Sequence, residues 1–187
     1  MEVGFDYLCK FVIFGDSEVG KTTLEAHLDP LLGPRDLSEF TIGVNFQKKT
    51  VGIKGHRAKL QIWLMLSEDR FFKSDIFRAQ IKGSLGAILL YDITNASSLD
   101  RVPTWCEVLE EHCGNIPILL VGNKIDEEKQ RAVSKTRAVE VREKYNLASY
   151  MEISAKTGAN VEKLFDLVAE LMIKKFQPNR LNHRIES

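Results

Sequence analysis

The sequence predicts an α/β fold, a mostly parallel sheet flanked by helices, and three observations support this class. Short apolar, β-branched runs alternate with stretches of helical periodicity along the 187 residues. A glycine-bearing turn joins the first apolar run to the first helix. Two polar segments follow later apolar runs, at the carboxyl ends of strands, where open α/β sheets bind their ligands.

The predicted elements follow one another without internal repeats or a linker. Trp105 lies on the apolar face of its helix and is expected in the core. In chain order we expect strand 8–14, a helix from Lys21, strands 44–53 and 58–66 joined by a hairpin at 52–55, strand 85–91, a helix opened by Asn95 or Ser97, strand 116–121, helix 134–145, strand 150–153 and a helix capped by Asn160.

Length and composition indicate one globular domain. Hydrophobic residues make up 44%, enough for a sizeable core. We place the domain at residues 1–177 and a short tail at 178–187. Lys and Arg number 26, as do Asp and Glu, so no net field steers nucleic acid to the protein, and we expect no such partner.

Cysteine usage and the absence of targeting segments predict a cytoplasmic protein. Cys9, Cys106 and Cys113 show no C-x-x-C spacing and are expected to be free thiols in a reducing compartment. The first residues lack a secretory signal, and no apolar run has the length of a membrane span.

The segment from Gly15 to Thr22, GDSEVGKT, matches the phosphate-loop pattern G-x-x-x-x-G-K-[ST]. Glycines let backbone N–H groups curl around phosphates, and the helix N-terminus adds its positive end. Lys21 would contact the β- and γ-phosphates, and the Thr22 hydroxyl would bind Mg²⁺. The plainer alternative is a strand-to-helix turn with an exposed lysine.

Two segments in the C-terminal half of the chain predict which base is bound. Residues 123–126 read NKID and residues 154–156 read SAK. The Asp126 carboxylate can accept hydrogen bonds from guanine N1–H and its exocyclic amine, a donor pair that adenine lacks. The aliphatic part of Lys124 can cover the base face, and the Ala155 N–H can donate to guanine O6.

These motifs resemble the Ras superfamily. The segments GDSEVGKTT, LLYDIT, VGNKID and EISAKTG carry the resemblance, and TIGVNF and LQIW are similar to the Rab family in particular. It extends from about Tyr7 to Phe176. It implies a P-loop NTPase (small G-protein) fold with six strands and about five helices, a GDP/GTP switch, Mg²⁺, and regulation by exchange factors, activating proteins and effectors.

The resemblance also assigns residues. Thr41 would reach Mg²⁺ and the γ-phosphate; without the resemblance it is an ordinary strand-entry threonine. Catalytic roles fall to Lys21, Thr41 and Glu68, and metal binding falls to Thr22 and Thr41. Regulators and effectors would bind through Thr41–Phe46 and Leu64–Phe72. The nucleotide-binding residues would be Gly15, Asp16, Ser17, Glu18, Val19, Gly20, Lys21, Thr22, Thr23, Asn123, Lys124, Asp126, Ser154, Ala155 and Lys156.

The chain departs from the family after Trp63. The family pattern there is D-T-A-G-Q-E, and this chain reads LMLSED. Leu64 replaces the Asp that binds a Mg²⁺-bound water, Ser67 replaces the Gly, and Glu68 replaces the Gln that positions the attacking water. The apolar run is either a longer buried strand or an exposed patch that a partner covers. Upstream, Leu31 or Leu32 stands in for the aromatic residue that packs against guanine.

The sequence thus predicts a guanine-nucleotide switch of the Rab/Ras type, a low-activity GTPase converting GTP to GDP and phosphate. The alternative is a non-hydrolysing pseudo-GTPase, an interaction module that nucleotide stabilises. A P-loop kinase or ATPase would leave NKID and SAK without a task. The tail has no cysteine for prenylation and Glu2 precludes myristoylation, so we expect no autonomous membrane anchor, and recruitment to membranes through partners.

Overall fold

The computed structural model describes residues 5–28, 44–53, 55–65 and 75–176. They form a six-stranded sheet in the order β2-β3-β1-β4-β5-β6. Strand β2 is antiparallel to β3 and the other neighbours are parallel, which confirms the predicted mostly parallel sheet. The strands are Tyr7–Phe14 (β1), Val44–Ile53 (β2), His56–Met65 (β3), Gly86–Asp92 (β4), Ile118–Asn123 (β5) and Ser149–Glu152 (β6).

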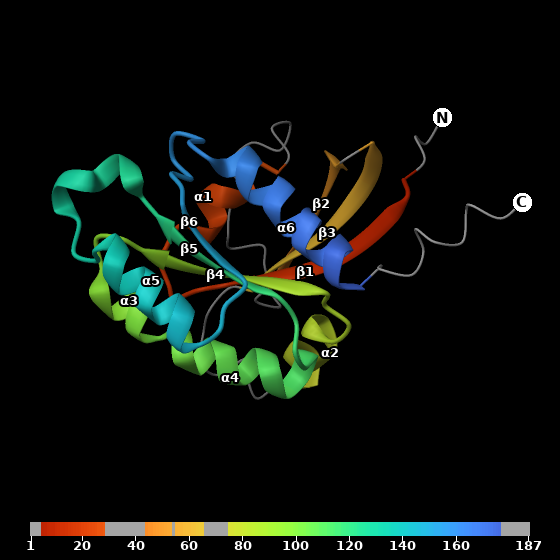
Figure 1. Ribbon diagram of the computed structural model, residues 1–187, viewed down its shortest axis with the longest axis horizontal. Coiled ribbons are helices and arrows are strands. Elements are labelled where there is room, and N and C mark those ends of the chain that lie inside the picture. Colours follow the sequence, from red (N-terminus) through yellow and green to blue (C-terminus); the bar gives the residue numbers. More distant parts are fainter. Residues whose placement is uncertain (1–4, 29–43, 54, 66–74, 177–187) are drawn as a thin grey trace, which may run out of the picture.

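Helices cover both faces of this sheet (Figure 1). Helices α1 and α6 lie on one face, and α2 to α5 lie on the other. In the described part of the chain the helices are Lys21–Glu25 (α1), Asp75–Ile81 (α2), Ala96–Asp100 (α3), Val102–Cys113 (α4), Lys135–Lys144 (α5) and Val161–Phe176 (α6), with a 3₁₀ helix at Ile125–Gln130 (η3).

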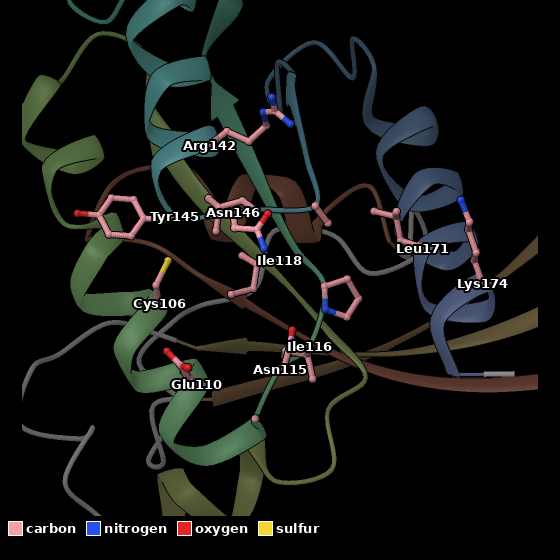
Figure 2. Close-up of a pocket in the computed structure, with 14 residues that line it drawn as sticks. Cys106, Glu110, Asn115, Ile116, Ile118, Arg142, Tyr145, Asn146, Leu171 and Lys174 are labelled. Atoms are coloured by element: carbon pink, nitrogen blue, oxygen red, sulfur yellow. The ribbon is translucent and has the colours of Figure 1, made fainter. Parts of the chain in front are cut away.

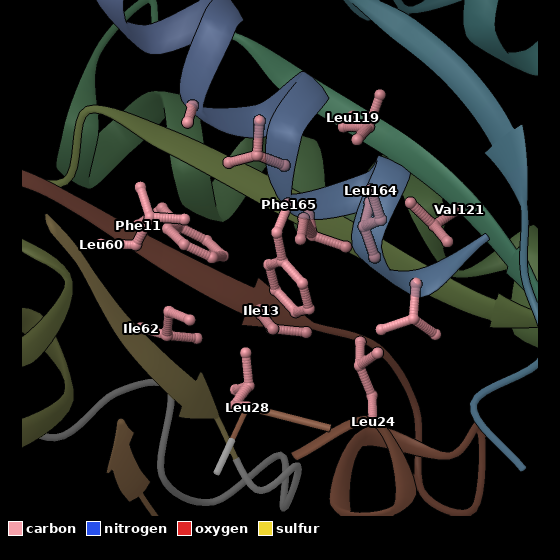
Figure 3. Packing of buried hydrophobic residues seen from close by; sticks show 14 of the residues in the cluster. Phe11, Ile13, Leu24, Leu28, Leu60, Ile62, Leu119, Val121, Leu164 and Phe165 are labelled. Carbon is pink, nitrogen blue, oxygen red and sulfur yellow. The ribbon is translucent and has the colours of Figure 1, made fainter. Parts of the chain in front are cut away.

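Two hydrophobic cores lie on opposite faces of the sheet because successive strand residues point to opposite sides. Phe11 and Ile13 of β1 join the core under α1 and α6, where Phe165 packs 6.3 Å from the Phe11 ring centroid (Figure 3). Val12 and Phe14 join the opposite core, which also contains Trp105, fully buried as predicted.

Most predicted ranges match the structure, but the helix expected after Asn95 is divided in two. Asn95 caps α3, its side-chain oxygen accepting from Ser97 N at 3.1 Å. Helix α4 then begins after Arg101 with a proline in its first turn. Pro103 has no N–H to continue the hydrogen bonds of α3 and is well placed to start a new helix. Helix α2 has no counterpart among the predicted ranges.

The prediction that Asn160 caps the last helix is correct for its backbone and wrong for its side chain. The Asn160 carbonyl accepts from Leu164 N at 3.0 Å, so α6 begins there. Its side-chain amide instead donates to the Glu152 carbonyl at 3.0 Å, and its φ is 62°. The residue therefore connects α6 to β6.

Two further predictions concern the cysteine thiols and membrane-spanning helices. Cys9, Cys106 and Cys113 are free thiols, and burial raises the pKa of Cys9 and Cys106 to about 11. No helix among the described residues combines the length and apolar character needed to cross a bilayer.

Candidate nucleotide-binding site

The phosphate loop follows the carboxyl end of β1 and leads directly into α1. Two of its glycines are required by close packing. A Cβ on Gly15 (φ 153°) would collide with the Leu90 carbonyl oxygen, and a Cβ on Gly20 (φ 99°) would collide with the Asn123 side-chain amide. The loop therefore lies directly against β4 and β5, at the carboxyl end of β1.

Lys21 is held inside this loop. Its side chain is 5% exposed, and Nζ donates to the carbonyls of Gly15 at 2.7 Å and Asp16 at 2.5 Å. Burial lowers the pKa of Lys21 from its ordinary 10.5 to about 8, although the neighbouring Asp16 carboxylate favours the charged form. The plain alternative of an exposed lysine on a turn is wrong, because this ammonium lies among backbone carbonyls.

Glu18 occupies an unusual position in the loop. Its φ is 62°, a left-handed conformation that non-glycine residues seldom adopt. The side chain is exposed, as are those of Ser17 and Thr23, whereas Val19 is buried in the core and Thr22 is partly buried. Glu18 thus places a carboxylate on the loop that is predicted to bind phosphates.

Asn123 joins the phosphate loop to the second segment predicted to contact the base, residues 154–156. It is 2% exposed at the end of β5. Its Nδ2 donates to the Val19 carbonyl at 2.8 Å, and its Oδ1 accepts from Ala155 N at 2.8 Å. The Ala155 N–H assigned to guanine O6 is thus engaged with Asn123 in this structure. Asn123 therefore connects its own segment, 123–126, to the phosphate loop and to segment 154–156.

The side chains predicted to contact the base lie at the ends of β5 and β6. Asp126 Oδ1 accepts from Ser154 Oγ at 2.5 Å, and its Oδ2 lies 3.8 Å from Lys156 Nζ. Lys124 has a φ of 71°, and its Nζ forms an ion pair of 2.6 Å with Asp92 at the end of β4. A carboxylate accepts about four hydrogen bonds, so Asp126 keeps capacity for further donors.

Three residues that sequence reasoning missed support these loops. His27 Nε2 lies 2.5 Å from the Ala155 carbonyl, so Ala155 is held through both its N–H and its carbonyl. Asp92 pairs with Lys124 as described. Arg101, which stacks on Trp105, lies 3.5 Å from the Asp16 carboxylate. No sequence signal marks such contacts, since their partners are distant in the chain.

Leu64 lies in β3, where it pairs with Ile13 of β1. Ile13 comes two residues before Gly15, the first residue of the phosphate loop. The Leu64 side chain is 0% exposed and belongs to the core under α1. Met65 is 2% exposed, so the interpretation of a longer buried strand is confirmed to Met65 and that of an exposed patch is wrong for these two residues.

The described residues fit Mg²⁺ only in part. Thr22 at the start of α1 carries a suitable oxygen, whereas Leu64 carries none. No group of three or more His, Cys, Asp or Glu side chains able to hold a metal occurs among the residues that the structure describes. Thr41, Ser67, Glu68 and the leucines at 31 and 32 lie outside those residues, as do most of the predicted partner surfaces 41–46 and 64–72.

A cavity of about 890 Å³ lies elsewhere, between α4, α5 and the C-terminal part of α6 (Figure 2). Cys106 and Glu110 of α4, Arg142 of α5, and Leu171 and Lys174 of α6 line it. It adjoins the start of β5, whereas the phosphate loop follows the end of β1. This cavity is therefore separate from the candidate site.

Comparisons with known proteins agree with the geometry. The Ras family pattern matches residues 10–174. The chain is 39% identical to human Ras-related protein Rab-30 over 184 residues, 98% of this chain and 89% of the relative. It is 37% identical to human Ras-related protein Rab-8B over 91% of this chain and 81% of the relative. It is 35% identical to the Ras-related protein SEC4 of Candida albicans over 91% of this chain and 80% of the relative.

Proposed function

The chain is a Rab-like member of the Ras family of small GTPases, and from this premise we propose that it is a GDP/GTP-binding switch that hydrolyses GTP slowly. Residues 1–177 would form the nucleotide-binding domain and 178–187 a short tail. Regulators and effectors would bind at 41–46 and at 66–72, after the buried Leu64 and Met65. The protein would reside in the cytoplasm and reach membranes through these partners.

The observation that carries the proposal is the convergence on Asn123. One buried side chain holds the phosphate loop through Val19 and the second base segment through Ala155. Asp126 follows it by three residues and lies against Ser154. A phosphate site and a carboxylate suited to guanine are thus fixed relative to one another, which is the requirement for binding one guanine nucleotide at both ends.

The chain's own residues would act on the nucleotide as follows. Lys21 would exchange its carbonyl contacts for phosphate oxygens and place positive charge on them. Asp126 would accept from guanine, and the Lys124 stem would cover the base. Bound Mg²⁺ would neutralise phosphate charge; Thr22 and Thr41 would hold it. Asp16, Ser17, Glu18, Gly20 and Thr23 would contribute backbone or side-chain contacts from the loop.

Slow hydrolysis follows from the segment after Trp63. Leu64 offers no acceptor for a metal-bound water, and one charge-assisted hydrogen bond contributes about 1.5–3 kcal/mol. Ser67 would restrict the backbone where the family has Gly. Glu68 would bring negative charge toward the γ-phosphate in place of a neutral amide. Ground-state binding would suffer less, because the phosphate and base loops supply most contacts.

A competition experiment tests the binding proposal. One portion of purified protein is denatured and the released nucleotide is identified by chromatography. In a second portion, emptied of nucleotide without denaturation, GTP and ATP compete for the site. We expect a guanine nucleotide on release and at least about a hundredfold preference for GTP, since ATP would leave the Asp126 carboxylate unpaired. Equal competition by ATP would refute the assignment of Asp126.

The buried Leu64 also favours a second candidate, a pseudo-GTPase whose fold needs nucleotide but whose switch no longer turns over. The two candidates differ in the nucleotide that accompanies the purified protein. GDP with slow phosphate release indicates a switch. Intact GTP that persists indicates an interaction module.

A further inference from the structure

Arg131 lies just after η3 and uses all five N–H donors of its guanidinium. Two pair with Glu152, at 2.8 and 2.9 Å, and two with Glu128, at 2.8 and 2.7 Å; NH1 also donates to the Val133 carbonyl at 3.0 Å. The Arg131 side chain is 15% exposed and that of Glu152 is 10% exposed. Such a double fork is possible for arginine and not for lysine.

Glu152 extends this network into the sheet. Tyr150 donates to Glu152 Oε1 at 2.6 Å, and the Tyr91 hydroxyl lies 3.3 Å from that of Tyr150. Burial by itself would raise the pKa of Glu152, but the hydrogen bonds from Arg131 and Tyr150 lower it overall. Burial, together with the bond to Glu152, raises the pKa of Tyr150. The Arg131–Glu152 ion pair is therefore charged on both sides at neutral pH.

The two halves of the network belong to the two base-contacting segments. Glu128 lies in η3, two residues after Asp126, and Glu152 ends β6, two residues before Ser154. Helix η3 has no fully buried residue, and Ile125, which is partly buried, is its apolar residue that packs against the core. Its backbone contact to the other segment is a bond of 3.2 Å from Ile125 N to the Ile153 carbonyl. The forked contacts of Arg131 thus hold η3 in place together with the hydrogen bond from Ser154 to Asp126.

We propose that Arg131 is a positioning residue for guanine recognition, which sets the separation between Asp126 and the Ser154–Lys156 segment by joining Glu128 to Glu152. This inference rests on the proposed function. It deepens that function by giving Arg131 an indirect role, through Glu128 and Glu152. Loss of Arg131 should weaken recognition of the base while leaving recognition of the phosphates intact.

The test compares nucleotide ratios in purified full-length protein. GDP and inosine diphosphate differ by the exocyclic amine that Asp126 would bind, and GTP and GDP differ only by a phosphate. In Arg131→Gln we expect the GDP-to-inosine-diphosphate affinity ratio to fall at least about fivefold, a typical coupling between linked sites. The GTP-to-GDP ratio should stay at its wild-type value. A merely structural role would lower the melting temperature without changing either ratio.

Two further variants make the result interpretable. Arg137→Gln breaks an exposed pair with Asp100 (side chains 43% and 62% exposed) and should change neither ratio. Glu128→Gln removes one arm of the fork at an exposed position and should lower the first ratio by a smaller amount; it decides the matter if Arg131→Gln does not fold.

The outcomes separate the two proposals. A wild-type protein that prefers GDP and variants that keep this preference would overturn the role of Arg131 alone. An equal change in Arg137→Gln would do the same. A wild-type protein without preference for guanine would overturn the proposed function and this inference with it.

Discussion

In the proposed function, the Asp126 carboxylate would give the site its base selectivity. It is held by Ser154 Oγ and keeps acceptor capacity for the two guanine donors. Asp126→Asn places an amide that is partly a donor against those donors. We expect GTP affinity to fall by about two to four decades, the loss of two charge-assisted hydrogen bonds, and xanthosine triphosphate to bind better than before. Competition binding measures both; unchanged GTP affinity would contradict the assignment.

Glu18 introduces strain and charge into the same loop. Its left-handed backbone costs about 1–2 kcal/mol relative to glycine, and its carboxylate lies on an anion-binding loop. Glu18→Gly should therefore raise both thermal stability and GDP affinity. Glu18→Gln is the matched control, because it removes the charge and keeps the strained backbone. It should raise GDP affinity without raising thermal stability. If neither variant binds GDP more tightly, the carboxylate does not face the phosphates.

Lys21 makes nucleotide binding sensitive to alkaline pH. Burial lowers its pKa to about 8 in the folded protein, below its ordinary 10.5. The folded state thus loses this proton first, so between these values the cost of burying the charge is relieved and stability rises with pH. Phosphate favours the charged form, so GDP affinity should fall as pH rises above about 8, by up to about tenfold per unit. Calorimetric titration should show this slope in the wild type and not in Lys21→Met.

At the scale of elements, β3 shows what could be read from sequence. Strand β2 matches the predicted 44–53, and β3 covers His56–Met65 where 58–66 was expected, because alternating and apolar runs report burial directly. The break between α3 and α4 at Arg101 was not foreseen, because the apolar spacing of Val102, Trp105 and Leu109 lies wholly within α4 and does not mark where that helix begins. The proline in the first turn of α4 is the local signal for the break.

Leu64 carries the element-scale prediction. It is fully buried, so Leu64→Asp should destabilise the protein by about 2–5 kcal/mol or more in the presence of a chelator. Mg²⁺ with GDP should restore part of this stability, because the new carboxylate gains a cationic partner. Thermal melts with and without Mg²⁺ measure the difference, and Leu64→Asn should show a smaller one. Equal Mg²⁺ dependence in the wild type and Leu64→Asp would place residue 64 away from the metal.

At the scale of the whole molecule, the site divides into contacts that a sequence reveals and contacts that only the fold reveals. The phosphate loop is contiguous, and its lysine and glycines were predicted from their spacing. The contact of His27 with Ala155 joins residues 128 positions apart, and that of Asn123 with Val19 joins residues 104 apart. No periodicity encodes such pairs, because they depend on the order of strands in the sheet.

Single-turnover GTP hydrolysis shows most plainly whether the protein is a guanine-nucleotide switch with impaired hydrolysis. GTP-loaded protein is mixed with Mg²⁺, and bound GTP and GDP are measured over time beside the variant Leu64→Asp, Ser67→Gly, Glu68→Gln. We expect the wild type to retain GTP and the triple variant to hydrolyse it at least about tenfold faster, as expected from restored transition-state contacts. A wild type that retains no GTP, or one that hydrolyses it as fast as the triple variant, would contradict the claim.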